Sequence, residues 1–153
     1  MRVFAFDVGQ RRTGVAVSDA SGVLARPLRV LHGPGAMDEA VRLVAAASSE
    51  DPVAAIVVGL PRRLDGSDTH LTPAARQFAE TIAARTGLPV TLQDERLSSV
   101  EAESRLALRE RDWRVRKARV DAAAAAVILQ DYLDAQPRPV TPPNGDEDEE
   151  AGW

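Results

Sequence analysis

The stretch Phe4–Asp19, FAFDVGQRRTGVAVSD, decides the fold of this chain, because it returns one apolar strand directly into a second. Asp7 closes the first run of strand-forming residues, and Gly9 permits either a positive φ or a close packing that a side chain would prevent. A polar turn over 10–12 leads into the second apolar run, Thr13–Val17. Asp7 is therefore expected at a strand end, where the sheet opens to solvent.

The Asp7 carboxylate is a candidate functional group, since a charge at a strand end is costly unless a hydrogen bond, a cation or a metal compensates it. The alternative is a turn aspartate that accepts a hydrogen bond from its own backbone, which is common.

Length and charge divide the chain into a folded part and a tail. The 153 residues suffice for about one domain, which we place at 1–135. Residues 136–153 contain one arginine and five acidic side chains, so they account for the net charge of -4 and leave 18 basic and 18 acidic side chains in 1–135. The tail is rich in proline and in like charge, which predicts disorder.

Composition excludes several classes of site. The sequence has no cysteine, which rules out disulfides and thiolate zinc sites. Its two histidines, His32 and His70, lie in loop-like stretches and are expected at the surface. No apolar run approaches the ~20 residues of a membrane helix and no signal peptide is recognisable, so we expect a cytoplasmic protein without a membrane partner.

A basic cluster stands out in the otherwise neutral folded part. The stretch Arg105–Arg119 has seven cationic and two acidic side chains. Such a cluster is the footprint expected for a polyanion, and a solvated helix face is the alternative.

The order of predicted elements indicates an α/β fold. Strands are predicted over 2–7, 13–18, 23–31, 53–58 and 89–93, and helices over 37–49, 73–85, from a capping box at 98–101 onward, and over 120–134. Thr72 is the expected N-cap of the helix over 73–85, and Gly87 lies beyond its end. This order predicts a mixed five-stranded sheet flanked by helices.

Asp94 and Glu95 follow the last predicted strand directly. Because strand ends converge on one edge of an open α/β sheet, a carboxylate there can share a ligand with Asp7. The alternatives are a solvated loop, or acids favoured by the dipole of the following helix.

Asp121 is predicted near the start of the final helix, on the same face as Ala124, Ala125 and Ile128. The small alanines let that face lie close to a sheet, with the carboxylate at its head. A helix cap is the alternative interpretation.

Four motifs together resemble those of the YqgF family, also called RuvX, which are small bacterial proteins of the ribonuclease H-like fold. The resemblance covers about residues 1–135, and only the loop over 67–73 departs from the usual pattern. The motifs are Asp7-x-Gly9-x-x-Arg12-x-Gly14-x-Ala16-x-Ser18-Asp19, Val57-Val58-Gly59-Leu60-Pro61 with Asp65-Gly66, Asp94-Glu95-Arg96-Leu97, and Asp121-x-x-Ala124-Ala125.

The resemblance implies a metal-dependent nuclease with a ribonuclease H-like fold. Asp7, Glu95 and Asp121 would be the catalytic residues and would hold Mg²⁺ or Mn²⁺, with Asp7 bridging two ions that activate water and stabilise the leaving oxygen. The residues expected to meet substrate phosphates are Arg12, Arg96, Arg114, Arg116, Lys117 and Arg119.

The resemblance also suggests a substrate. It implies processing of the 5′ end of precursor 16S ribosomal RNA by a monomer or homodimer, and resolution of branched DNA is the alternative nuclease activity. Two other readings are a nucleic-acid-binding transcription regulator without turnover, and a sugar-kinase or actin-like ATPase, for which the chain is too short.

Overall fold

The computed structural model describes residues 1–95 and 113–136. Five strands and three helices make up this described part. In chain order they are β1 (Arg2–Val8), β2 (Arg12–Ser18), β3 (Ala25–His32), α1 (Ala36–Ser48), β4 (Val53–Leu60), α2 (Thr72–Thr86), β5 (Val90–Asp94) and α4 (Trp113–Ala135). The five strands and the first two helices begin and end within two residues of their predicted bounds.

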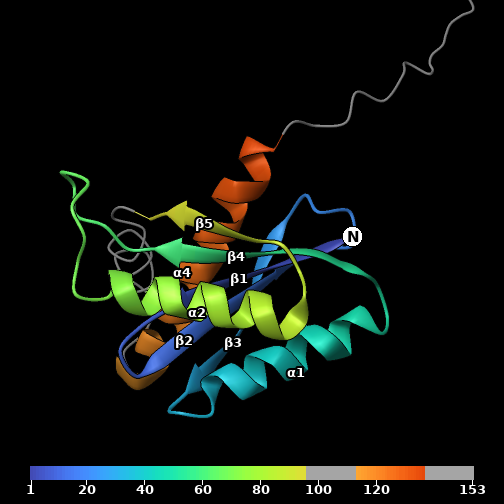
Figure 1. The fold of residues 1–153 in the computed structure, drawn as a ribbon, viewed down its shortest axis with the longest axis horizontal. Coiled ribbons are helices and arrows are strands. Elements are labelled where there is room, and N and C mark those ends of the chain that lie inside the picture. The colour runs from blue at the N-terminus through green and yellow to red at the C-terminus, as the bar shows by residue number, and fades with distance from the viewer. Residues whose placement is uncertain (96–112, 137–153) are drawn as a thin grey trace, which may run out of the picture.

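The strands form one mixed sheet in the order β3-β2-β1-β4-β5 (Figure 1). The chain returns from β1 through β2 to β3 in antiparallel pairs, as the tight polar turn requires. Strands β4 and β5 then add in parallel to β1, so the carboxyl ends of β1, β4 and β5 lie at the same edge. The predicted mixed five-stranded sheet is confirmed.

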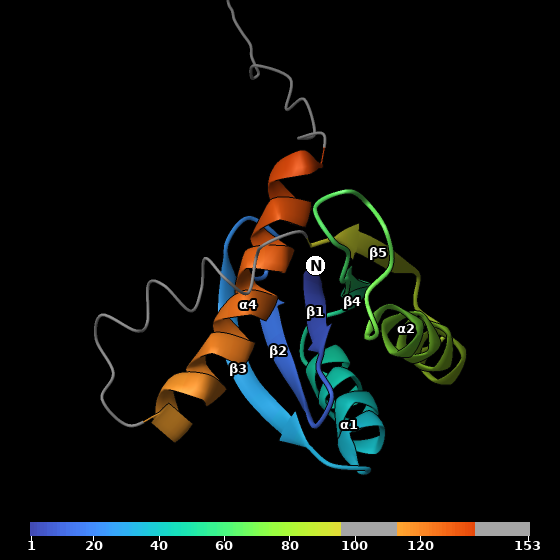
Figure 2. The same cartoon turned by 90° about the vertical axis from the view of Figure 1, so that its left-hand side faces the viewer.

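Helices cover both faces of this sheet, with α1 and α2 on one face and α4 on the other (Figure 2). Alternation along β1 places Phe4 and Phe6 in the core beneath α1 and α2, and Val3 and Ala5 in the core beneath α4. Asp7 follows Val3 and Ala5 in this alternation. Its side chain therefore belongs to the α4 face of the sheet.

The predicted N-cap of α2 is wrong, because Thr72 is the first residue of the helix and is fully buried. Its hydroxyl donates a 2.6 Å hydrogen bond to the Pro61 carbonyl and accepts a 2.8 Å bond from the Thr69 amide. The side chain thus ties α2 to the end of β4. At the other end, Gly87 lies beyond the last helical residue, as predicted, and it adopts a left-handed φ of 73°.

We expect Thr72→Val to lower the free energy of unfolding by about 1–3 kcal/mol, since it leaves the half-buried Pro61 carbonyl without the Thr72 donor. Chemical denaturation measures this change. Thr86→Val is the matched control, because it removes a hydroxyl that bonds only within its own helix and its adjoining turn. An equal loss in both variants would contradict a special role for the link to β4.

Helix α4 begins at Trp113, seven residues before the predicted start. Arginine, lysine and alanine all favour helix. The charged arginine and lysine side chains, however, interrupt the apolar periodicity on which the predicted start depended. Asp121 therefore lies inside the helix, and its interpretation as a cap is wrong. The predicted helix from 98 onward and the tail over 137–153 lie outside the described residues.

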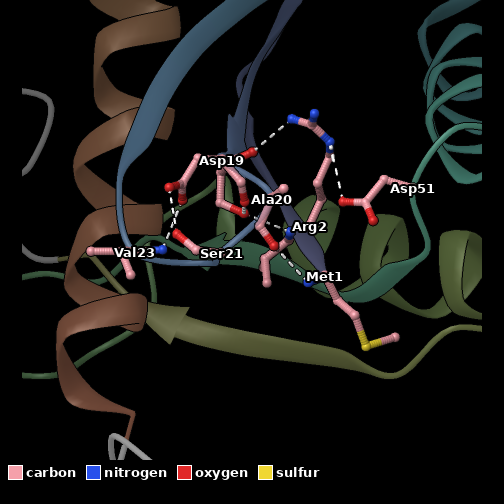
Figure 3. A network of polar contacts seen from close by, with 9 residues as sticks. Met1, Arg2, Asp19, Ala20, Ser21, Val23 and Asp51 are labelled. Atoms are coloured by element: carbon pink, nitrogen blue, oxygen red, sulfur yellow. Dashed lines mark hydrogen bonds and ion pairs between the residues drawn. The ribbon is translucent and has the colours of Figure 1, made fainter.

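Polar contacts fix the end of the sheet opposite Asp7 (Figure 3). The α-ammonium group of Met1 donates a 2.6 Å hydrogen bond to the Ala20 carbonyl, and the Arg2 guanidinium lies 3.6 Å from the Asp51 carboxylate. The Ser21 hydroxyl in the β2–β3 turn holds the pKa of Asp19 at about 2, together with the backbone amides that follow it. These contacts set the starting register of β1.

Candidate active site

Asp7 stands at the carboxyl end of β1, where its backbone pairs with Gly14 of β2. The residue is half-buried. Directly after it, Gly9 donates a 2.8 Å backbone hydrogen bond to the Arg12 carbonyl, and a Cβ on Gly9 would lie only 2.7 Å from that oxygen. Of the two roles predicted for Gly9, close packing is the correct one.

Glu95 follows the last residue of β5, and its amide donates a 3.2 Å hydrogen bond to the Leu60 carbonyl of β4. The residue is only 8% exposed, and its Oε2 atom is buried without a hydrogen-bond partner among the described residues. The alternative of a solvated loop is therefore wrong for Glu95, whereas the neighbouring Asp94 is exposed.

Asp7 and Glu95 lie together although they come from strands separated by β4. The pKa of Glu95 is raised to about 9, first by burial and then, in decreasing order, by the charge of Asp7, a hydrogen bond to Asp7 and the charge of Asp94. The two carboxyl groups therefore share a proton in the absence of a cation, with Glu95 as donor and Asp7 as acceptor.

This pair fits a hard divalent cation. A cation would replace the shared proton, compensate both charges and supply a partner for the buried Oε2 atom, and Mg²⁺ and Mn²⁺ prefer such oxygen ligands. Across 1–95 and 113–136, no three His, Cys, Asp or Glu side chains form a complete metal cluster. The described residues thus provide two of the three predicted ligands.

The third predicted ligand, Asp121, has a described backbone but no described side chain. One turn further along α4, Ala124 and Ala125 are buried, and so is Ile128 after a second turn. Ala125 and Ile128 pack with Ala5 and Val57 on the sheet face that also bears Asp7. The helix therefore lies on the predicted side of the sheet, and the role of Asp121 stays a prediction.

The predicted phosphate-binding residues fall into three groups. Arg12 is half-buried at the start of β2, and alternation places it on the same sheet face as Ala16, which packs beneath α4. Arg96 lies outside the described residues. Four more lie on the first two turns of α4, where only the backbone is described: Arg114, Arg116, Lys117 and Arg119.

Other predicted surface features are confirmed. His32 and His70 are both exposed. None of the helices over 36–48, 72–86 and 113–135 has the length and hydropathy that a membrane crossing demands.

Comparison with known proteins assigns the family. The family model described as "RuvX: Holliday junction resolvase" matches residues 1–135. A protein of Anaeromyxobacter sp. (strain Fw109-5) is 48% identical over 139 residues, which cover 89% of this chain and 98% of that protein. A protein of Thiobacillus denitrificans is 41% identical over 134 residues, covering 88% and 92%. Both bear the name "Putative pre-16S rRNA nuclease".

A solved structure is similar at lower sequence identity. Thermus thermophilus RuvC is 18% identical, with a TM-score of 0.49 over 88% of this chain and 95% of that one. The family match and the close relatives carry the assignment, and the sheet order agrees with the ribonuclease H-like fold predicted from the four motifs. The chain belongs to the RuvX family.

Proposed function

We propose that this protein is a metal-dependent endonuclease that processes the 5′ end of precursor 16S ribosomal RNA in the cytoplasm. The observation that carries the proposal is the pair of half-buried Asp7 and buried Glu95. Its shared proton, and the Glu95 Oε2 atom that has no hydrogen-bond partner within 1–95 and 113–136, suit a divalent cation. The names of the close relatives support RNA as the substrate.

In this proposal Asp7, Glu95 and Asp121 hold Mg²⁺ or Mn²⁺. The bound ions would supply an activated water and stabilise the leaving oxygen of the phosphodiester, so the reaction needs no histidine base. Asp7, at the strand end, would contribute its carboxylate as one of the ligands. Glu95 contributes a carboxylate shielded from water, which strengthens its attraction to a cation.

The arginines would hold the substrate rather than cut it. Arg12 lies on the same sheet face as Asp7, where a guanidinium can bind a phosphate through two hydrogen bonds. Contacts of this kind position the strand without reading its sequence. Arg96, directly after Glu95 in the chain, is proposed to act in the same way.

The decisive experiment offers two substrates in parallel. Purified protein is incubated with precursor rRNA fragments and with four-way DNA junctions, each with Mn²⁺ and with a chelator. We expect Mn²⁺-dependent cleavage of the RNA. Cleavage of junctions alone would favour the activity in the description of the family model, and binding without any cleavage would favour a regulator.

The basic cluster, Arg105–Arg119, should determine the salt dependence of binding. If about five of its cations contact phosphates of a single strand, log affinity should fall against log salt with a slope of roughly -3.5. Replacing Arg114 and Arg116 with Ala should make the slope shallower by about 1.4. Filter binding at several salt concentrations measures both values.

An unchanged slope in the double variant would show that the substrate binds elsewhere. The next residues to replace are then Arg11, Arg12, Arg62 and Arg63, of which Arg11 and Arg63 are exposed.

A further inference from the structure

Gly59 lies between the two carboxylates of the candidate site. Strand β4 separates β1 from β5, and Gly59 pairs with Gln93 of β5, two residues before Glu95. On its other side, Gly59 follows Val58, which pairs with Phe6, the residue before Asp7. Alternation puts Gly59 on the same face as Val57, beneath α4.

The Glu95 carboxyl group occupies the space that a side chain on Gly59 would fill. A Cβ built on Gly59 would lie 2.0 Å from Glu95 Oε2 and 3.0 Å from its Cδ, and 2.7 Å from Ile128 Cδ1 of α4. The distances to Glu95 Oε2 and Ile128 Cδ1 are shorter than real Cβ contacts allow, and the distance to Glu95 Cδ is tighter than nearly all of them. The Glu95 carboxyl thus reaches Asp7 by crossing over the bare backbone of β4.

Backbone conformation does not explain this glycine. The φ of Gly59 lies outside the left-handed range, unlike that of Gly22, Gly66 and Gly87, so any residue could adopt it. A glycine inside a strand also weakens the strand, because it loses more freedom on folding and packs no side chain. The remaining physical reason is space.

We propose that Gly59 is a positioning residue whose missing side chain lets the Glu95 carboxylate cross β4 and join Asp7 as a ligand of the catalytic cation. The proposal rests on the proposed metal-dependent function. Both groups that an alanine would meet are the ends of flexible side chains, so the variant should fold with Glu95 turned away from Asp7.

The first test is titration of the metal-free full chain with Mn²⁺ by calorimetry. We expect Gly59→Ala to bind Mn²⁺ about 10–100-fold more weakly, as for loss of a group that orients a ligand. Gly35→Ala is the matched control, because a Cβ there meets nothing within 4 Å and its φ of -84° suits alanine. Wild-type affinity in Gly59→Ala would overturn the proposal.

A second variant separates the two clashes. Ile128→Val removes the Cδ1 atom that the new methyl group would meet, and leaves Glu95 unchanged. Gly59→Ala with Ile128→Val should remain as weak a binder as Gly59→Ala. Recovery of wild-type affinity in the double variant would overturn the proposal, because packing against Ile128 would then be the cause.

Thermal unfolding without metal distinguishes failure of this proposal from failure of the proposed function. Above the raised pKa of Glu95, about 9, where both carboxyl groups are ionised, Asp7→Asn should raise the melting temperature, because it removes a charge that repels Glu95, and this shift should vanish in the Gly59→Ala background. A shift of equal size in both backgrounds would overturn the positioning role. Absence of Mn²⁺ binding in the wild type would instead overturn the metal-dependent function, and the thermal comparison would still decide the positioning role.

Discussion

Asp7→Asn is expected to reduce cleavage of precursor rRNA by orders of magnitude while the protein stays folded. Asparagine keeps the shape of the side chain but removes the anionic oxygen that would bridge the cations. Without metal and above the raised pKa of Glu95, about 9, where both carboxyl groups are ionised, the variant should be more stable than the wild type, because it removes the charge that repels Glu95. Cleavage assays at saturating Mn²⁺ and thermal unfolding in chelator measure the two effects.

Asp65→Asn provides the control. Asp65 is an exposed turn aspartate whose pKa is lowered by hydrogen bonds from the Ser67 hydroxyl and amide. Its replacement changes the net charge by the same amount and should leave cleavage unchanged. A wild-type rate in Asp7→Asn would refute a catalytic role for Asp7.

Without metal, the protein should lose stability as the pH rises from about 4.5 to about 9. The pKa of Glu95 is raised from 4.5 to about 9 in the folded protein, so in this window the folded state keeps a proton that the unfolded chain has released. Because the unfolded state binds fewer protons, the free energy of unfolding falls with pH, by about 1 kcal/mol per pH unit. Urea denaturation at a series of pH values in chelator measures the slope.

Glu95→Gln should flatten this profile, since glutamine does not ionise. The aspartates with lowered pKa values do not interfere. Asp19, with a pKa of about 2, adds stability that is lost only as the pH falls below its ordinary value of 3.8. A profile of equal slope in the wild type and in Glu95→Gln would contradict the buried, proton-sharing pair.

The fold was predictable because two features of the sequence indicate the strands and their pairing. The tight turn after Asp7 requires an antiparallel return, and the continuous apolar run at 53–58 requires a strand with both faces covered. The start of α4 was not predictable, because the arginines from Arg114 to Arg119 interrupt the apolar period. The prediction of Thr72 as the N-cap of α2 failed for another reason. A threonine before a proline is a typical cap, and only the tertiary fold shows that its hydroxyl bonds to Pro61 instead.

The meeting of Asp7 and Glu95 was also predictable, since parallel strands end at one edge of the sheet. Their distinct protonation states were not. Glu95 is buried by neighbours from β4 and α4 that lie far from it in the sequence, and burial is the largest cause of its raised pKa. A glycine at position 59 is equally consistent with several roles until the atoms around it are placed.

The sheet order has a consequence for the newly made chain. Strands β1 to β3 can pair as soon as they emerge, because tight turns connect them and their contacts are local. Glu95 arrives only after α2 has crossed back and β5 has added in parallel to β4. An unfinished chain therefore carries Asp7 but not its partner. By this order of assembly, a nascent chain that ends before residue 95 lacks one of the ligands proposed for the catalytic cation.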